Sequence, residues 1–187
     1  MRTALLIIDM QNFFAEMVAG SKIHVLELCS YFRAKNMPQY FTQHGHSQDE
    51  LMNKKPNQLV RKWGASGSIA TGSEDWQLIP EIADAWSAAG KPPIVAKNTY
   101  DAFINTDLET RLRDERVERL LVVGVMTDCC CDTTARSAFN RGFETWLIND
   151  ACGTASEAQH KAALKSFKFA FGEVIDTATA LKKLREE

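Results

Sequence analysis

The chain has 187 residues, 45% of them hydrophobic and 25% charged, and a formal net charge of −2 at pH 7. This composition suits one globular domain over residues 1–187. The small negative net charge argues against electrostatic binding to nucleic acid or to an anionic membrane. No apolar run reaches the length of a membrane span, and the run before Asp9 is too short for a signal peptide. We expect a small-molecule partner, and a homo-oligomer of two or four copies.

Five cysteines occur, and three of them, Cys129, Cys130 and Cys131, are adjacent. An odd number with three contiguous members is a poor disulfide framework, because neighbouring side chains cannot bridge without strain. We therefore expect reduced thiols and a cytoplasmic protein, with unconventional export left open.

Short apolar runs alternate with helical patterns along the chain. We expect strands over residues 3–9, 38–43, 93–98, 119–125, 144–150 and 173–177. Helices are expected over 21–36 behind a Ser cap, over 106–116, where T-D-L-E has the spacing of a capping box, and over 156–171. Apolar strands separated by helices predict a doubly wound α/β fold, with a mainly parallel six-stranded sheet and helices on both faces.

The segment from residue 44 to 78 interrupts this alternation. It has little periodicity and contains the Gly- and Ser-rich stretch KWGASGSIATGSEDW, which indicates a long excursion over the sheet edge. A solvated loop and a lid or partner-contact loop are both open interpretations. The carboxyl-terminal KKLREE is expected to be frayed.

Polar residues stand where three of the predicted strands end. Asp9 closes the first strand, Lys97 lies near the end of the third, and the cysteine triplet follows the fourth. In a doubly wound sheet these ends can share one crevice. A thiol at a helix N-terminus beside an ammonium is expected to be a thiolate, with the carboxylate as its base. Singly, each residue has a structural explanation as a cap, a solvent-facing lysine or a core cysteine, so only their convergence indicates a nucleophilic site.

Spacing separates one of the three cysteines from the others. Cys131, Ala135, Ala138 and Gly142 form a row of small residues, which is typical of a helix packed closely on a sheet. Cys131 is therefore expected in the core, whereas spacing alone leaves Cys129 and Cys130 open.

Three motifs carry a family resemblance. The stretch GVMTDCCCDTTARSAFNRGF closely resembles the signature of the isochorismatase-like cysteine hydrolases, ALLIIDMQNFF resembles their first-strand motif, and VAKNTYDAF resembles their lysine motif. The three motifs occur in the family's order and span nearly the whole chain.

The resemblance implies roles for particular residues. Its register makes Cys130 the nucleophile, Asp9 the acid and base, and Lys97 the stabilising cation, with Cys129 lining or backing the loop. It also implies a cis peptide between Val125 and Met126, with the backbone N–H groups of Met126 and Cys130 holding an oxyanion. The implied reaction cleaves an amide, carbamoyl or ureido C–N bond through a thioester.

The substrate pocket is expected to be an apolar slot for a small planar molecule. Five side chains near the catalytic positions or on the excursion are its predicted wall: Phe14, Trp76, Tyr100, Phe103 and Met126.

Departures from the family pattern define the alternatives. The metal-binding D-x-H of the nicotinamidases is replaced by His44-Gly-His46, which lacks a clear third ligand. We therefore expect no metal and no cofactor, and this departure disfavours a nicotinamidase. Vinyl-ether hydrolysis of isochorismate, which needs a proton donor and not a thiol, is the first alternative, and a catalytically silent binding module is the second. A redox thiol protein would need C-x-x-C, which is absent.

Overall fold

The computed structural model describes residues 1–187 and is built on one parallel sheet. Its strands are β1 (Thr3–Ile8), β2 (Gln39–His44), β3 (Val95–Lys97), β4 (Arg119–Val125), β5 (Glu144–Gly153) and β6 (Glu173–Ile175). They are ordered β3-β2-β1-β4-β5-β6, and every neighbouring pair is parallel. The chain thus winds outward from β1 to β3 and then outward from β4 to β6. Between β1 and β4 this order reverses, which is where such sheets bind ligands.

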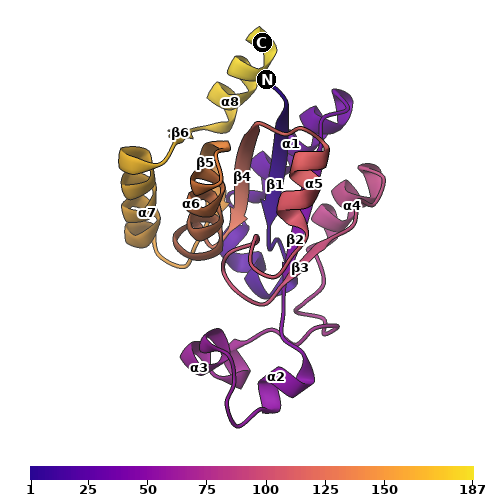
Figure 1. Ribbon diagram of the computed structural model, residues 1–187, viewed down its shortest axis with the longest axis vertical. Helices are drawn as coiled ribbons and strands as arrows, with labels where there is room; N and C mark the ends of the chain where they lie inside the picture. Colours follow the sequence, from indigo (N-terminus) through magenta and orange to yellow (C-terminus); the bar gives the residue numbers. More distant parts are fainter.

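Helices cover both faces of the sheet (Figure 1). One face carries α1 (Lys22–Ala34), α4 (Pro80–Ala88) and α8 (Thr177–Glu186), and the other carries α5 (Leu108–Asp114), α6 (Asp132–Asn140) and α7 (Glu157–Ala170). Strand β1 shows why two layers form. Its residues Leu5 and Ile7 belong to the core under α1, and its residue Leu6 belongs to the core under α5. The predicted doubly wound fold is confirmed.

Two local expectations are wrong. Thr106 makes no capping box, because its hydroxyl accepts from the Leu108 N–H at 3.3 Å and donates to the Ala102 carbonyl at 2.6 Å. The KKLREE end is helical and not frayed, because it continues α8, whose residue Leu181 is buried in the core. No helix has the length and apolar character needed to cross a membrane.

The excursion predicted over residues 44–78 begins one residue later, because His44 still belongs to β2; residues 45–78 lie beyond the carboxyl edge of the strands (Figure 1). It contains α2 (Gln48–Met52), α3 (Gln58–Trp63) and the short 3-10 turn η2 (Ala65–Gly67). Ser47 forms a capping box at the start of α2, and the Asn57 side chain caps α3. Isolated bridges join His46 to Ala70 and Gln11 to Leu78. The excursion is therefore a folded part of the domain and not a simple solvated loop.

One glycine sets the approach of the two central strands. Gly124 has φ +116°, and a Cβ there would lie 2.1 Å from the Ile8 carbonyl oxygen. Only glycine fits this position, so the ends of β1 and β4 can meet directly beside the candidate site.

Candidate active site

Asp9 is the first residue after β1, and the fold holds its carboxylate rigidly. Its φ is 48°, a left-handed conformation that Asp tolerates better than most residues. The Thr42 hydroxyl, on the neighbouring strand β2, donates to Asp9 Oδ1 at 2.5 Å and accepts from the Asp9 N–H at 3.0 Å. The carboxylate is completely buried.

Lys97, at the end of β3, reaches across β2 to Asp9. Its Nζ donates to Asp9 Oδ2 at 2.6 Å, to the Thr99 carbonyl at 3.0 Å and to Cys130 Sγ at 3.4 Å. The side chains of Lys97 and Asp9 are both 0% exposed. One ammonium therefore bridges the carboxylate and the thiol, as the strand ends predicted.

Cys130 lies on a five-residue π-helical turn, η3 (Thr127–Cys131), between β4 and α6. The peptide between Val125 and Met126 is cis, as the resemblance implied. The N–H groups of Cys129 and Cys131 both donate to the Met126 carbonyl at 3.1 Å. Cys131 is fully buried with Ala135, which confirms it as a core residue.

The protonation of the site differs from the expected thiolate. Burial raises the pKa of the Cys130 thiol more than Lys97 lowers it, and Asp9 raises it further. Burial disfavours the charge of Lys97, but Asp9 and then Cys130 outweigh it and raise the pKa of the ammonium. One buried cation cannot balance two anions, so Cys130 rests as a thiol and the thiolate expectation is wrong for the free site. A proton passing from Cys130 to Asp9 leaves the net charge unchanged.

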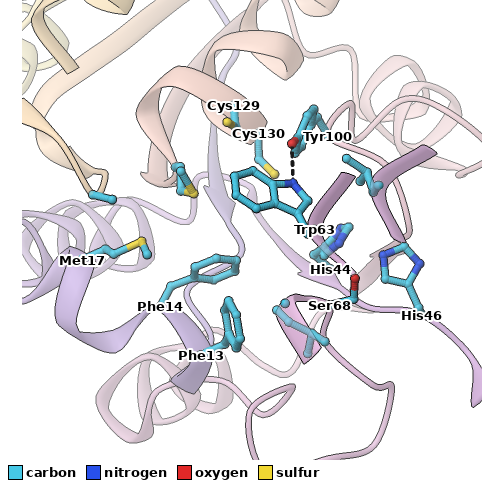
Figure 2. A pocket seen from close by; sticks show the side chains of 15 residues that line it. Phe13, Phe14, Met17, His44, His46, Trp63, Ser68, Tyr100, Cys129 and Cys130 are labelled. Carbon is cyan, nitrogen blue, oxygen red and sulfur yellow. Dashed lines mark hydrogen bonds between the residues drawn. The ribbon is translucent and has the colours of Figure 1, made fainter. Parts of the chain in front are cut away.

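A cavity of about 270 Å³ lies beside the Cys130 thiol (Figure 2). Of its 15 lining residues, 11 are hydrophobic, and they include Cys129 and Cys130. The predicted wall residues Phe14, Tyr100 and Met126 all line it.

Phe103 and Trp76 do not line this cavity, so their prediction is corrected. Phe103 is buried under the other face of the sheet, where its ring stacks on Phe143 with centroids 6.2 Å apart. Trp76 packs against Gly45, and its carbonyl accepts hydrogen bonds from the side chains of Gln11 and Gln43. These contacts hold Trp76 away from the cavity.

Other lining residues were missed from the sequence. The excursion supplies Trp63, whose indole Nε1 donates to the Tyr100 hydroxyl at 2.8 Å across the cavity (Figure 2). It also supplies Leu59, Gly67, Ser68 and Ile69, while η1 (Asn12–Val18) supplies Phe13 and Met17, and Ala155 lies beyond β5. Phe13 lies inside the quoted motif ALLIIDMQNFF, next to Phe14, and could have been predicted from it. Trp63 could not be predicted from the sequence, because no periodic pattern placed its segment over the site.

His44 and His46 lie side by side in the wall, with ring centroids 4.9 Å apart (Figure 2). Burial lowers the pKa of His44 to about 4, helped by Lys97, and burial also lowers the pKa of His46. No group of three or more His, Cys, Asp or Glu side chains could hold a metal ion. The residues present therefore do not fit the metal of the nicotinamidases.

A doubly wound sheet with a cysteine, a lysine and an aspartate at its switch point is the architecture of the cysteine hydrolases that the motifs resemble. The chain matches the family model described as the isochorismatase domain over residues 3–179. It belongs to this family, which confirms the resemblance.

The chain is similar in sequence to one relative and in structure to two solved proteins. The chain is 37% identical over 175 residues to Nicotinamidase 3 of Arabidopsis thaliana, covering 92% of this chain and 84% of that protein. A cysteine hydrolase from Pseudomonas syringae pv. phaseolicola has a TM-score of 0.84 at 24% identity, covering 99% of this chain and 93% of the other. Nicotinamidase PncA from Bacillus subtilis has a TM-score of 0.79 at 25% identity, covering 94% and 100%.

Proposed function

We propose that the protein hydrolyses the C–N bond of a small neutral carboxamide through a thioester on Cys130. The observation that carries this proposal is the buried contact of Lys97 with both Asp9 and Cys130, at 2.6 and 3.4 Å. A carboxylate, an ammonium and a thiol in one dry crevice supply a base, a fixed positive charge and a nucleophile.

The reaction follows from the resting protonation of the site. Asp9 takes the thiol proton as Cys130 Sγ attacks the carbonyl carbon, and the N–H groups of Met126 and Cys130 hold the oxyanion. Asp9 returns that proton to the amine nitrogen, the C–N bond breaks, and ammonia or an amine leaves the thioester. Asp9 then takes a proton from water, whose oxygen attacks the thioester, and the acid departs as Cys130 regains its proton. Lys97 stays charged throughout and offsets whichever anion is present.

The cavity favours an uncharged, planar acyl group. Aromatic side chains of Phe13, Phe14, Trp63 and Tyr100 line it, and no Lys or Arg does. Isochorismate, with its two carboxylates, would lose hydration there without gaining a cation, so the vinyl-ether alternative is disfavoured.

The similarity to Nicotinamidase 3 supports an aromatic carboxamide as the substrate class. The missing D-x-H motif concerns metal binding and not amide chemistry, so it no longer weighs against this class. The homo-oligomer, the cytoplasmic location and the absence of a cofactor stay predictions.

The test compares wild type with Cys130→Ala, Asp9→Asn and Cys131→Ala on a panel of aromatic and aliphatic carboxamides, carbamoyl compounds and isochorismate. We expect Cys130→Ala to lose at least about a thousandfold in kcat/KM, and Asp9→Asn to be inactive. Cys131→Ala should stay within about tenfold of wild type, because it changes only core packing. Intact-protein mass spectrometry should detect an acyl adduct on wild type alone.

Two results would replace the proposal. Isochorismate cleavage that survives Cys130→Ala, with no amide turned over by wild type, would establish the vinyl-ether alternative. Binding of carboxamides without adduct or turnover would establish the silent binding module.

A further inference from the structure

His160 lies on α7 and does not line the cavity, yet it contacts the turn that carries Cys130. Its ring is half-buried, and its Nδ1 lies 2.9 Å from the Thr127 hydroxyl oxygen. Thr127 is the first residue of the turn η3 and is completely buried. An apolar side chain would fill the same space as the ring, so packing alone does not explain this polar contact.

The direction of this hydrogen bond follows from a second one. The Thr127 hydroxyl also lies 3.1 Å from the Gly153 carbonyl oxygen, and a carbonyl only accepts. The single hydroxyl proton of Thr127 therefore goes to Gly153, and the hydroxyl oxygen accepts from His160. The ring proton of His160 is thus on Nδ1. A chain of two hydrogen bonds runs from α7 through the first residue of η3 to the end of β5.

Backbone hydrogen bonds hold the same turn from its other side. The Met126 carbonyl accepts from the N–H groups of Cys129 and Cys131, both at 3.1 Å. The peptide between Met126 and Thr127 is therefore held at its carbonyl by the turn itself, and at the side chain that follows it by His160. Both attachments are needed to fix the orientation of this peptide.

The loop before α7 is attached to the turn at a second point. The Thr154 hydroxyl donates to the carboxylate of Asp128, the second residue of η3. Ala155, the next residue of this loop, lines the cavity. The contact of His160 with Thr127 thus belongs to a two-point attachment of α7 and its preceding loop to the turn that carries Cys130.

We propose that His160 is a positioning residue, which acts through Thr127 to keep the backbone N–H groups of Met126 and Cys130 aimed at the oxyanion. This rests on the proposed function, in which these two N–H groups bind the oxygen of the tetrahedral intermediate. Such donors lower the barrier only where they already point to the place at which the charge develops. Because His160 does not line the cavity, its loss should weaken binding of the oxyanion and leave binding of the ground state unchanged.

Two substitutions separate the hydrogen bond from the space that the ring fills. His160→Leu keeps an apolar group of similar reach and removes the donor, whereas His160→Asn can place its amide N–H where Nδ1 lies. Gln159→Leu is the matched control, because Gln159 is the preceding residue on α7 and is exposed. The control should behave as wild type in every assay.

Benzaldehyde tests the oxyanion position without turnover. Cys130 Sγ adds to the aldehyde carbon, the carbonyl π bond opens, and the thiol proton reaches the aldehyde oxygen by way of Asp9. The adduct forms reversibly, and its oxygen occupies the oxyanion position. Benzamide bound to the Cys130→Ala protein is the reference for the ground state, since no bond to sulfur forms.

Calorimetry measures both ligands. We expect His160→Leu to raise the Kd of benzaldehyde about tenfold or more, because a small misplacement of the groups around a reacting centre is costly. The same substitution in the Cys130→Ala protein should change the Kd of benzamide by less than about twofold, because this interaction is made only with the oxyanion. His160→Asn should restore most of the benzaldehyde binding.

Steady-state kinetics on a carboxamide that wild type turns over gives a second readout. We expect His160→Leu to lower kcat about 10- to 100-fold with KM within about threefold of wild type, which is the signature of an interaction made only in the transition state. His160→Asn should stay within about fivefold of the wild-type kcat.

The two ligands distinguish positioning from a general loss of structure. The inference is overturned if His160→Leu leaves benzaldehyde binding unchanged, if it weakens benzamide binding as much, or if His160→Asn behaves like His160→Leu. It is also overturned if wild type binds benzaldehyde no better than Cys130→Ala does, since no adduct then forms. Turnover judges the proposed function separately: carboxamide hydrolysis by wild type would support it in each of these cases. A selective loss of benzaldehyde binding, with no carboxamide turned over by wild type, would support the inference and sink the proposed function.

Discussion

Replacing Lys97 by Met should convert a neutral buried pair into an isolated buried charge. The Lys97 Nζ to Asp9 Oδ2 distance is 2.6 Å and both side chains are 0% exposed, so only the Thr42 hydroxyl would still bind the carboxylate. Removing one partner of such a pair costs about 3–5 kcal/mol of unfolding free energy. Since domains of this size are stable by about 5–15 kcal/mol, the loss is large.

The same variant should acquire a characteristic pH dependence. Without the ammonium, the folded variant buries an unpaired carboxylate, and burial disfavours the charged form, so the folded variant binds more protons than the unfolded chain. Its stability should therefore fall as the pH rises, by up to about 1.4 kcal/mol for each pH unit. Protonation at low pH restores part of the loss.

Urea unfolding at pH 5, 6, 7 and 8 checks both statements. The double variant Lys97→Met, Asp9→Asn should recover most of the loss at pH 7 and lose the added pH slope, because it has no charge to bury. A single variant within about 1 kcal/mol of wild type at every pH would refute our account of the pair.

Three further changes are open to measurement. The pKa of His44 is about 4 in the folded protein against 6.5 for the free side chain, so the unfolded state binds more protons between these pH values and stability falls as the pH drops from 6.5 to 4. His44→Gln should remove about 3 kcal/mol of that loss in thermal melts, and an unchanged loss would contradict the lowered pKa of His44. Trp63→Phe deletes the 2.8 Å bond to the Tyr100 hydroxyl and should weaken carboxamide binding about two- to tenfold in calorimetry, whereas unchanged Kd values would remove Trp63 from the binding wall. Gly124→Ala places a Cβ 2.1 Å from the Ile8 carbonyl oxygen and should lower the unfolding free energy by about 4 kcal/mol or more in urea unfolding. Gly142→Ala, whose Cβ would have nothing within 4 Å, should lower it much less, and similar urea midpoints for the two variants would contradict the close contact of β1 and β4.

The sheet could be predicted because its central strands are apolar on both faces. In β4, for example, Leu121 faces one core and Val122 the other, and this continuous apolar run is typical of a parallel strand. The helix α8 was missed because its charged end dominates the pattern, although Ala180 and Leu181 are buried. Local spacing does not reveal what a surface helix packs against.

The site was predictable where strand ends determine it and not elsewhere. Asp9 and Lys97 follow from the rule that parallel strands end at one edge. The state of Cys130 did not follow, because a helix start is visible in the sequence but complete burial is not. The place of Trp63 in the cavity wall depends on how the excursion folds back over the sheet, which no periodicity records.

The wall of the cavity and the polar groups beneath it come from different parts of the chain, which matters for redesign. The proposed reacting groups come from the ends of strands and the turn after β4. The lining residues Leu59, Trp63, Gly67, Ser68 and Ile69 all come from one continuous stretch. That stretch leaves and rejoins the domain near the paired residues His46 and Ala70. Its two ends are fixed by this pairing, and changes at exposed positions between the capped helices α2 and α3 cost little thermodynamically. A library confined to residues 47–69 would sample new acyl groups while the hydrolytic chemistry beneath it stays constant.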